Sequence, residues 1–471
     1  MHLDEEACLR ALRAHDARFD GLFFVAVSST GIYCRPICTA RQPKRENITF
    51  FASAAEAEHA GYRPCRLCRP ELAPGRSPLE SKRRIAAAVV RRVDSGESLK
   101  GMAEELGITD RHLRRAVRQE LGVTPVELVQ THRLLTAKAL LTDTRLPLFH
   151  VAAASGFSSV RRFNALFSER YRLSPSALRK HAASLPAGEV RCQIGFRPPY
   201  DWDRLIRFLS ARAIPGVESI DRSAYARVVR VAGKLGWVSV SPSQRRSALL
   251  VRMSESLAPV MPKVLRRVRR LFDTDADPQA LLAVLGPMAE SAPGLRIPGA
   301  FDAFEMAIRA ILGQQVSVRA ASTMAARIAQ TYGDRTETPF PTLEIAFPSP
   351  ERISQLTQAD LAVLGITTAK SRAILALATQ IASGDLRLES ATDPECTMAK
   401  LAEFPGIGEW TAAYLAMRAL GYPDAFPHGD LGIRRALGET NSQRILEFAE
   451  RWRPWRAYAA IHLWNSLEER K

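Results

Sequence analysis

The sequence predicts a multidomain protein that is mainly α-helical with α+β parts. Three observations support this fold class. The 471 residues are enough for three or four domains. The composition, 46% hydrophobic and 24% charged, is ordinary for a globular protein and excludes collagen-like, low-complexity and wholly disordered chains. The residue pattern also changes along the chain, from a small cysteine-rich segment to a basic helical one, an α+β one and an all-helical one.

Stretches rich in Pro, Gly and Ser mark the segment boundaries. Residues 69–78 and 184–188 have this composition and predict linkers. In the third segment, β-type alternation predicts strands, and an amphipathic helix is expected at 203–213. The expected strands cover 190–196, 225–231, 236–240 and 248–253. We therefore predict four domains, at residues 1–77, 78–183, 188–290 and 291–471.

A surplus of positive charge indicates a polyanionic partner. The chain has 66 Lys and Arg against 49 Asp and Glu, a formal net charge of +17, which favours nucleic acid or an anionic surface. The surplus is densest at 78–183, which holds 19 basic and 10 acidic residues. No apolar run approaches the ~20 residues that span a bilayer, and the N-terminus lacks a signal-peptide pattern. We expect a cytoplasmic protein with no membrane partner.

Four of the seven cysteines form two close pairs. Three residues separate Cys34 from Cys38, two separate Cys65 from Cys68, and 26 lie between the pairs. This spacing lets four sulfurs reach the corners of a tetrahedron around Zn²⁺, so zinc is the expected cofactor. On spacing alone, a purely structural zinc site is the more common case, and that alternative stays open.

The residues around the two pairs are more specific than their spacing. Phe-Phe-Val-Ala-Val-Ser-Ser-Thr-Gly-Ile-Tyr precedes Cys34, and Arg-Pro-Cys65-Arg-Leu-Cys68-Arg-Pro contains the second pair. Over about residues 5–72 the chain resembles the N-terminal domain of the Ada alkylation-response proteins. The resemblance implies that Cys34 is a zinc ligand and also accepts a methyl group from a methylphosphotriester in DNA. Cys38, Cys65 and Cys68 would complete the metal site, and zinc would keep the sulfur as the nucleophilic thiolate.

Two similar patterns lie about 50 residues apart in the basic segment. In each, at 99–117 and 148–167, a short amphipathic stretch and a glycine turn precede an Arg-rich stretch. Such helix-turn-helix units lay a recognition helix in the major groove, and the segment resembles the AraC-type double helix-turn-helix DNA-binding domain. For each single residue a solvated helix face is the alternative. The residues expected to face DNA are Arg111, His112, Arg114, Arg115, Arg161, Arg162 and Asn164.

In the last segment a Pro-Gly-Ile-Gly turn introduces a helix. Amide groups at a helix N-terminus suit a DNA phosphate, so Gly406, Ile407 and Gly408 are the expected phosphate-binding residues; an ordinary helix connection is the alternative. Asp430 follows 22 residues after Gly408 in a Gly- and Pro-rich loop. This order resembles the helix-hairpin-helix (HhH-GPD) DNA glycosylases. Further matches over about 190–468 resemble the AlkA-type 3-methyladenine glycosylases, whose small α+β N-terminal domain would be 188–290.

The glycosylase resemblance assigns a role to Asp430. Breaking the N-glycosidic bond of an alkylated purine passes through an oxocarbenium-like state, which a carboxylate stabilises while it orients or deprotonates water. A helix N-cap is the alternative for this residue. Trp410 occupies the position, two residues after the last hairpin Gly, where strand-cutting members carry Lys. We therefore expect a glycosylase without Schiff-base lyase activity.

The target base must leave the stack and enter a pocket. Electron-rich rings favour a cationic base, and the resemblance places Trp410, Tyr414, Trp464 and Phe208 in this pocket; plain core packing is the alternative. Gln315 matches the residue that wedges into the vacated stack and is apolar in some family members. The chain has no motif for O6-methylguanine repair, so we predict none.

Together these features predict a sensor, transcriptional regulator and repair enzyme in one chain. Methylation of Cys34 would activate promoter binding by the basic helical segment, and the C-terminal half would excise alkylated purines. Double-stranded DNA is the expected partner, with RNA polymerase as a further one, and a monomer is expected. Two alternatives stay open: a transcription factor with an inactive glycosylase half, and a glycosylase whose front half only targets DNA through a structural zinc site.

Overall fold

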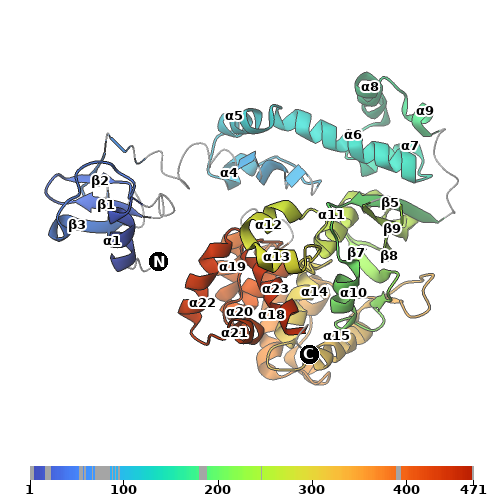
Figure 1. The fold of residues 1–471 in the computed structure, drawn as a ribbon. Coiled ribbons are helices and arrows are strands. Elements are labelled where there is room, and N and C mark those ends of the chain that lie inside the picture. Colours follow the sequence, from blue (N-terminus) through green and yellow to red (C-terminus); the bar gives the residue numbers. More distant parts are fainter. Residues whose placement is uncertain are drawn as a thin grey trace. The chain divides into compact units, whose positions relative to one another are not determined.

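The fold is described from a computed structural model of the chain (Figure 1). Two compact units contain residues 1–93 with 98–130, and residues 94–97 with 131–471. The expected linkers at 69–78 and 184–188 lie, apart from residues 70 and 188, outside the described residues. The described ranges are 5–15, 23–51, 57, 60–65, 67–68, 70, 85–86, 88–90, 92–93, 96–179, 188–245, 247–388 and 394–468.

A small sheet organises the cysteine-rich segment. Strand β1 (Phe24–Val27) pairs antiparallel with β2 (Ile32–Cys34) and β3 (Ile48–Phe51), and β4 (Arg63–Pro64) runs parallel to β2. Helix α1 (Glu5–Arg13) shares one core with β1 and β3, and the short 3-10 helix η2 spans Arg45–Asn47. The sheet places Cys34 at the end of β2 and residue 65 directly after β4.

The first helix-turn-helix unit follows in the same compact unit. Its helices are α4 (Met102–Glu105) and α5 (Asp110–Leu121). Met102, Leu113 and Val117 are buried in one apolar cluster, which holds the two helices together. Helix α6 (Pro125–Asp143) begins after the turn that follows α5.

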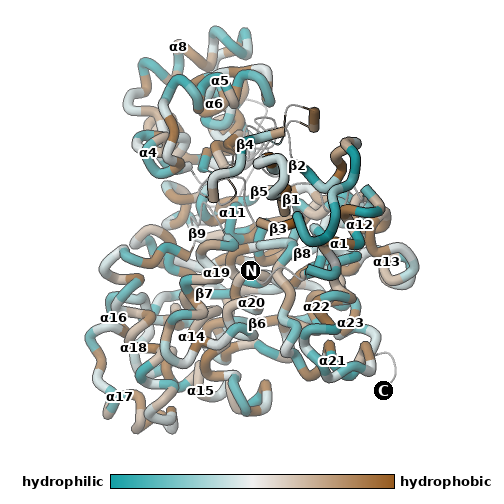
Figure 2. The backbone as a smooth tube through the Cα atoms, turned by 90° about the vertical axis from the view of Figure 1, so that its left-hand side faces the viewer, coloured by the Kyte–Doolittle hydropathy of each residue, from teal (hydrophilic) through white to brown (hydrophobic). Residues whose placement is uncertain are grey.

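The second helix-turn-helix unit is built in the same way. It consists of α7 (Leu148–Ala154) and α8 (Val160–Tyr171), followed by α9 (Pro175–Arg179). Phe163 and Phe167 are completely buried from one side of α8. Hydrophobic and hydrophilic positions alternate along α8 (Figure 2), as expected for a helix that packs on one face only.

An antiparallel five-stranded sheet forms the α+β part, in the order β5-β9-β8-β7-β6. The expected helix and the four expected strands are present, and β6 is an additional strand. Helix α11 shares the main core with this sheet and α10. The elements are β5 (Glu189–Gly195), α10 (Trp202–Ser210), β6 (Glu218–Ile220), β7 (Tyr225–Val231), β8 (Lys234–Pro242), β9 (Ala248–Ser254), η4 (Glu255–Val260) and α11 (Met261–Phe272).

Among the remaining residues that the structure describes, the regular elements are helices and one two-stranded ribbon of β10 and β11. The fold class, a multidomain and mainly helical chain with α+β parts, is confirmed. The elements are α12 (Pro278–Leu285), α13 (Pro287–Ser291), α14 (Ala303–Leu312), α15 (Val318–Tyr332), β10 (Asp334–Arg335), β11 (Ile345–Ala346), α16 (Pro350–Ser354), α17 (Gln358–Ala362), α18 (Thr368–Ala382), α19 (Pro394–Ala402), α20 (Glu409–Arg418), α21 (Leu431–Leu437), α22 (Ser442–Ala449), η5 (Glu450–Trp452) and α23 (Arg456–Glu468). None of the described helices is long and apolar enough to cross a membrane.

A buried ionic network joins the five-stranded sheet to helix α14. Arg309 donates to the carboxylates of Glu218 at 3.1 Å and Glu305 at 3.0 Å. Arg227 also pairs with Glu305, and the Tyr225 hydroxyl donates to Glu218 at 2.7 Å. The side chains of Arg227, Glu218 and Glu305 are at most 5% exposed. Every buried charge here has an opposite partner, so no ion between the sheet and the helix is left uncompensated.

Candidate active site and metal centre

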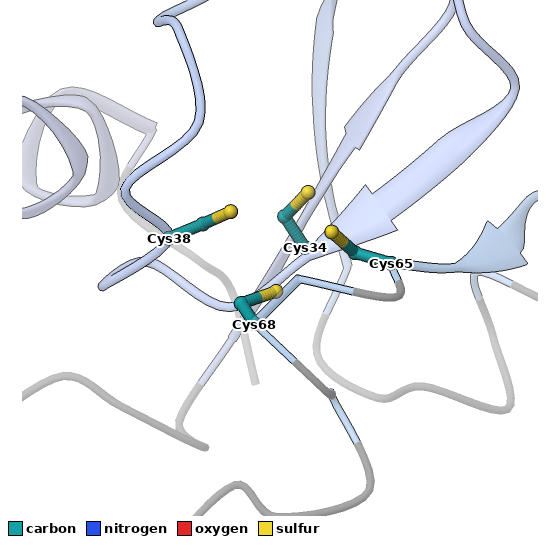
Figure 3. Close-up of side chains that lie close together, drawn as sticks. All are labelled: Cys34, Cys38, Cys65 and Cys68. Atoms are coloured by element: carbon teal, nitrogen blue, oxygen red, sulfur yellow. The ribbon is translucent and has the colours of Figure 1, made fainter.

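The four predicted cysteine ligands meet at one point (Figure 3). Their Sγ atoms all lie within 4.8 Å of one another. A tetrahedral zinc site with Zn–S bonds of about 2.3 Å separates its sulfurs by roughly 3.8 Å, so the donor set fits zinc in number, type and spacing. Cys38 and Cys65 are buried, while Cys34 and Cys68 are partly exposed. Cys34 is therefore open to a reaction partner.

Hydrogen bonds shape the loop that carries the first pair. The Arg35 amide donates to Cys68 Sγ at 3.3 Å, and the Arg35 guanidinium donates to the Cys68 carbonyl at 3.1 Å. A hydrogen bond with Cys68, together with burial, raises the pKa of the Cys34 thiol. The same hydrogen bond lowers the pKa of the Cys68 thiol to about 6. Thiols this close cannot all ionise unless a cation balances their charge. The electrostatics of the cluster therefore also fit a bound metal ion.

The structure places the predicted DNA-facing arginines on the outer sides of α5 and α8, while His112 and Asn164 are half-buried. Arg111, Arg114 and Arg115 are exposed on α5, and His112 is half-buried. Leu113, Ala116 and Val117 point into the core from the same helix. The Thr109 side chain caps α5 by accepting from the His112 amide. The basic residues are thus free to contact a polyanion.

Helix α8 repeats this arrangement. Arg161 and Arg162 are exposed, Asn164 is half-buried, and Phe163 and Phe167 are buried. The Ser159 hydroxyl accepts from the Arg162 amide and caps the helix. Both Arg-rich helices are therefore amphipathic, with their polar sides outward.

A cavity of about 430 Å³ in the second compact unit gathers the predicted glycosylase residues. Phe208 reaches it from α10, Trp410 and Tyr414 from α20, Trp464 from α23, and Asp430 from the loop before α21. Gln315 does not line the cavity. It is exposed on the loop between α14 and α15, whose Gly313 and Val316 do line it.

Asp430 is held by three donors. Its Oδ1 accepts from the Trp464 indole N–H at 2.8 Å and from the Ile433 amide at 3.1 Å. Its Oδ2 accepts from the Trp410 indole N–H at 3.0 Å. Asp430 is therefore the N-cap of α21 and a cavity-lining carboxylate at once, so the two interpretations of this residue are compatible. A Cβ at position 432 would approach Oδ1 to 2.9 Å, which explains Gly432.

The aromatic side chains are packed with arginines that the sequence analysis did not single out. The Trp410 and Tyr414 rings stack with centroids 5.2 Å apart. Arg418 donates to the Tyr414 hydroxyl at 2.6 Å, and Arg212 lies 3.6 Å above the Phe208 ring. Burial acts to raise the pKa of Tyr414, but the charges of Arg418 and Arg212 lower it. The arginines that line the cavity are Arg204, Arg212, Arg296, Arg309 and Arg418.

The predicted hairpin lies between α19 and α20. Gly406 has a φ of +84°, and a Cβ there would lie 2.9 Å from that of Ala373. Ile407 is buried, while Gly408 is the N-cap of α20 and leaves the first amides of the helix without a side-chain acceptor. Gln314 donates to the Gly406 carbonyl at 2.8 Å. The hairpin is thus tied to the loop that carries Gln315.

Comparison with protein families divides the chain into four domain types. The models that match describe the metal binding domain of Ada (residues 7–71), a helix-turn-helix domain (102–181), the AlkA N-terminal domain (191–302) and the HhH-GPD superfamily of base excision DNA repair proteins (308–445). The fold and its sites therefore define a fusion of an Ada-type metal-binding domain, a helix-turn-helix domain and an AlkA-type glycosylase fold.

One relative matches along almost the whole chain. It is the "probable bifunctional transcriptional activator/DNA repair enzyme AlkA" of Mycobacterium tuberculosis, with 39% identity covering 99% of this chain and 97% of the relative. The chain belongs to this family of bifunctional transcriptional activator/DNA repair enzymes. DNA-3-methyladenine glycosylase 2 of Escherichia coli is 40% identical over 58% of this chain and 95% of its own.

A solved structure shares the fold of the C-terminal half. The 3-methyladenine DNA glycosylase from Archaeoglobus fulgidus aligns with a TM-score of 0.51 and 22% identity, over 58% of this chain and 97% of that one. The family resemblances and the fold class expected from the sequence agree with these matches.

Proposed function

We propose that the C-terminal half hydrolyses the N-glycosidic bond of alkylated purines in double-stranded DNA. The observation that carries this proposal is the Asp430 carboxylate in an aromatic-lined cavity of about 430 Å³. The 40% identity to a DNA-3-methyladenine glycosylase over the same region supports it. An alkylated purine carries positive charge and leaves readily, and the faces of Trp464 and Tyr414 would attract it.

In this mechanism the bond between C1′ and the base nitrogen breaks, and the bonding electrons leave with the base. The cationic base becomes neutral, while positive charge develops at C1′. The Asp430 carboxylate stabilises that charge. Water then adds its oxygen to C1′ and releases a proton, which leaves an abasic site. The flipped nucleotide would be held by phosphate contacts to the amides at Gly406, Ile407 and Gly408.

The proposed reaction stops at the abasic site. A lyase needs an amine that attacks C1′ and forms a Schiff base. Among the described side chains that line the cavity, five are arginines and none is a lysine. Trp410 stands two residues after Gly408, and its indole nitrogen carries no nucleophilic lone pair. These observations support a monofunctional glycosylase.

For the N-terminal domain we propose methyl transfer to Cys34. Its sulfur would form a bond to the methyl carbon of a methylphosphotriester, while the bond from that carbon to the ester oxygen breaks and a phosphodiester anion leaves. Cys34, Cys38, Cys65 and Cys68 would hold the metal. Bound zinc would supply charge that keeps the sulfurs as thiolates. The partial exposure of Cys34 supports this assignment.

The helix-turn-helix segment would then read promoter DNA. The exposed Arg residues of α5 and α8 support contacts with phosphates or base edges. Conversion of a thiolate into a neutral thioether removes one negative charge from the N-terminal domain, which reduces its repulsion from DNA. Recruitment of RNA polymerase at such promoters completes the proposed activator role.

The excision proposal is tested with Asp430→Asn. Release of N-methylated purines from duplex DNA should fall by several orders of magnitude, because an amide carries no charge to stabilise C1′. Glu409→Gln is the matched control, since Glu409 is exposed beside the hairpin and does not line the cavity. Undiminished release by Asp430→Asn would contradict the catalytic assignment.

The methyl-transfer proposal is tested by peptide mapping after incubation with DNA that contains methylphosphotriesters. A gain of one methyl group on the peptide with Cys34, absent from Cys34→Ala, is the expected result. An unmodified Cys34 in folded, zinc-loaded protein would contradict the proposal and would mean that the zinc site is structural and the N-terminal half only binds DNA.

A further inference from the structure

The contacts of Asp430 assign a second function to two aromatic residues of the cavity. Trp410 and Trp464 were expected only as faces for the flipped base. Their indole N–H groups donate to different oxygens of the same carboxylate, at 3.0 Å to Oδ2 and 2.8 Å to Oδ1. An indole N–H can only donate. Both oxygens must therefore accept, and this is the hydrogen-bonding pattern of a carboxylate anion.

These donors come from separate parts of the fold. Trp410 is on α20 and Trp464 is on α23, while Asp430 lies between them in the chain, at the start of α21. The Ile433 amide gives Oδ1 a second donor at 3.1 Å. Three donors on two oxygens hold both the position and the rotation of the carboxylate plane, so its remaining lone pairs have a fixed direction within the cavity.

The indole of Trp410 is itself anchored. One of its faces is stacked on Tyr414, at 5.2 Å between centroids and 13° between planes. The Tyr414 hydroxyl accepts from Arg418, which also donates to the carbonyls of Pro298 and Gly299. A ring held in this way presents its N–H edge to Asp430, and the stacked face is closed to a base.

We propose that Trp410 and Trp464 are positioning residues whose indole N–H groups aim the ionised Asp430 carboxylate at C1′ during base excision. This proposal rests on the excision activity proposed above and specifies how its charge is preorganised. Indole donors already engage both oxygens of the carboxylate. Its role is therefore that of an oriented negative charge, which stabilises developing positive charge without reorganisation.

The test uses Trp410→Phe and Trp464→Phe, which keep an aromatic ring but remove the N–H donor together with part of the indole's stacking surface. Single-turnover excision at saturating DNA should slow by about 10-fold for each variant, the size expected for one hydrogen bond to a charged group. DNA affinity and base flipping, followed by 2-aminopurine fluorescence in the substrate duplex, are measured alongside, and the excision rate of the bound complex should fall more than either of them. Trp455→Phe is the matched control, because its indole lies outside the cavity lining.

The outcomes distinguish a failure of this positioning role from a failure of the excision activity on which it rests. If wild-type protein releases no alkylated base, the proposed excision activity itself fails. If wild type is active, Asp430→Asn is inactive and both Phe variants excise at the wild-type rate, the indole donors are not needed and the positioning role is wrong. A loss in the Phe variants that appears in affinity or flipping, with an unchanged excision rate, would also overturn it and assign both rings to base stacking alone.

Discussion

Gln315 combines an exposed side chain with a left-handed backbone. Its φ is +57°, a region that costs most residues about 1–2 kcal/mol. Such strain persists where the surrounding loop enforces it, and here the neighbouring Gln314 is bonded to the hairpin and to Thr411. The backbone therefore presents Gln315 to solvent beside the cavity, in keeping with the proposed wedge.

Gln315→Gly removes the side chain while leaving the backbone conformation allowed, so it tests the side chain alone. Because glycine accepts a positive φ, the melting temperature should not fall. Excision from duplex DNA should slow several-fold, since nothing fills the vacated stack. Excision from single-stranded DNA, which has no stack to fill, should be unaffected. Equal rates on the duplex for variant and wild type would remove Gln315 from the mechanism.

Asp273 gives the stability of the protein a pH dependence. Burial raises its pKa to about 7, although the Ile297 amide opposes this. Between about pH 4 and 7 the folded state then binds more protons than the unfolded state, so the free energy of unfolding falls as pH rises. Burial, with the charge of Arg204, lowers the pKa of His462 to about 4 and produces the opposite trend below pH 6.5.

Asp273→Asn isolates the fall in unfolding free energy that Asp273 causes as the pH rises. Wild type should lose about 2.6 kcal/mol of unfolding free energy relative to the variant between pH 5 and 8. Denaturant titrations of both proteins across this range measure the difference, from which the His462 contribution cancels. A difference that does not change with pH would show that Asp273 titrates normally.

The predicted site residues and the arginines around them differ in how well their roles could be predicted from the sequence. Asp430 and Trp410 follow a turn and a loop that resemble those of the helix-hairpin-helix glycosylases, and this resemblance was enough to name them. Arg212 and Arg418 could not, because an isolated Arg in a basic chain is most often solvated. Only the folded arrangement puts their guanidinium groups against Phe208 and Tyr414.

At the scale of single elements, the hairpin before α20 depends on one glycine more than on the other. Gly406→Ala places a Cβ at positive φ and 2.9 Å from the Cβ of Ala373, so it should cost more than about 1 kcal/mol and weaken DNA binding. Gly408 has a φ of −82° and nothing within 4 Å of its Cβ position. Gly408→Ala should therefore cost less than Gly406→Ala, about 0.5–1 kcal/mol, because glycine is favoured over alanine at the N-cap that Gly408 occupies.

Thermal unfolding and duplex-DNA binding of the two variants measure this asymmetry. Equal destabilisation by both substitutions would mean that the close approach to Ala373 is relieved by movement of α18. Because both glycines neighbour the same proposed phosphate site, each variant is the other's control for changes near the DNA.

Strands and helices with a clear period could be predicted from the sequence. Tyr225–Val231 was expected with the bounds that β7 has, because it combines β-branched residues with turns at both ends. Strand β6, Glu218–Ile220, was missed. Three residues cannot show a period, and this strand exists because β7 supplies its partners. The domain boundaries at 77 and 183 remain predictions, since they lie outside the described residues.

At the scale of the whole molecule, the proposed methyl transfer and the proposed base excision take place in separately folded parts of the chain. The cysteine cluster and Asp430 lie in different compact units with different cores. Removing the metal with a strong chelator should abolish methyl transfer to Cys34 and leave the excision rate unchanged. Peptide mapping and base-release assays on the same chelated sample check this. A parallel loss of excision would mean that the metal site supports the fold of the C-terminal half.

The ionic network around Arg309 links two stretches of the glycosylase region that match different family models. Glu218 and Arg227 belong to the stretch that matches the AlkA N-terminal domain, and Arg309 to the HhH-GPD stretch. A chimera that takes one stretch from a relative with different buried charges leaves an ion without its partner, at a cost of about 3–5 kcal/mol. In recombination between relatives with different buried charges, we therefore expect functional chimeras to keep residues 191–445 together from one parent.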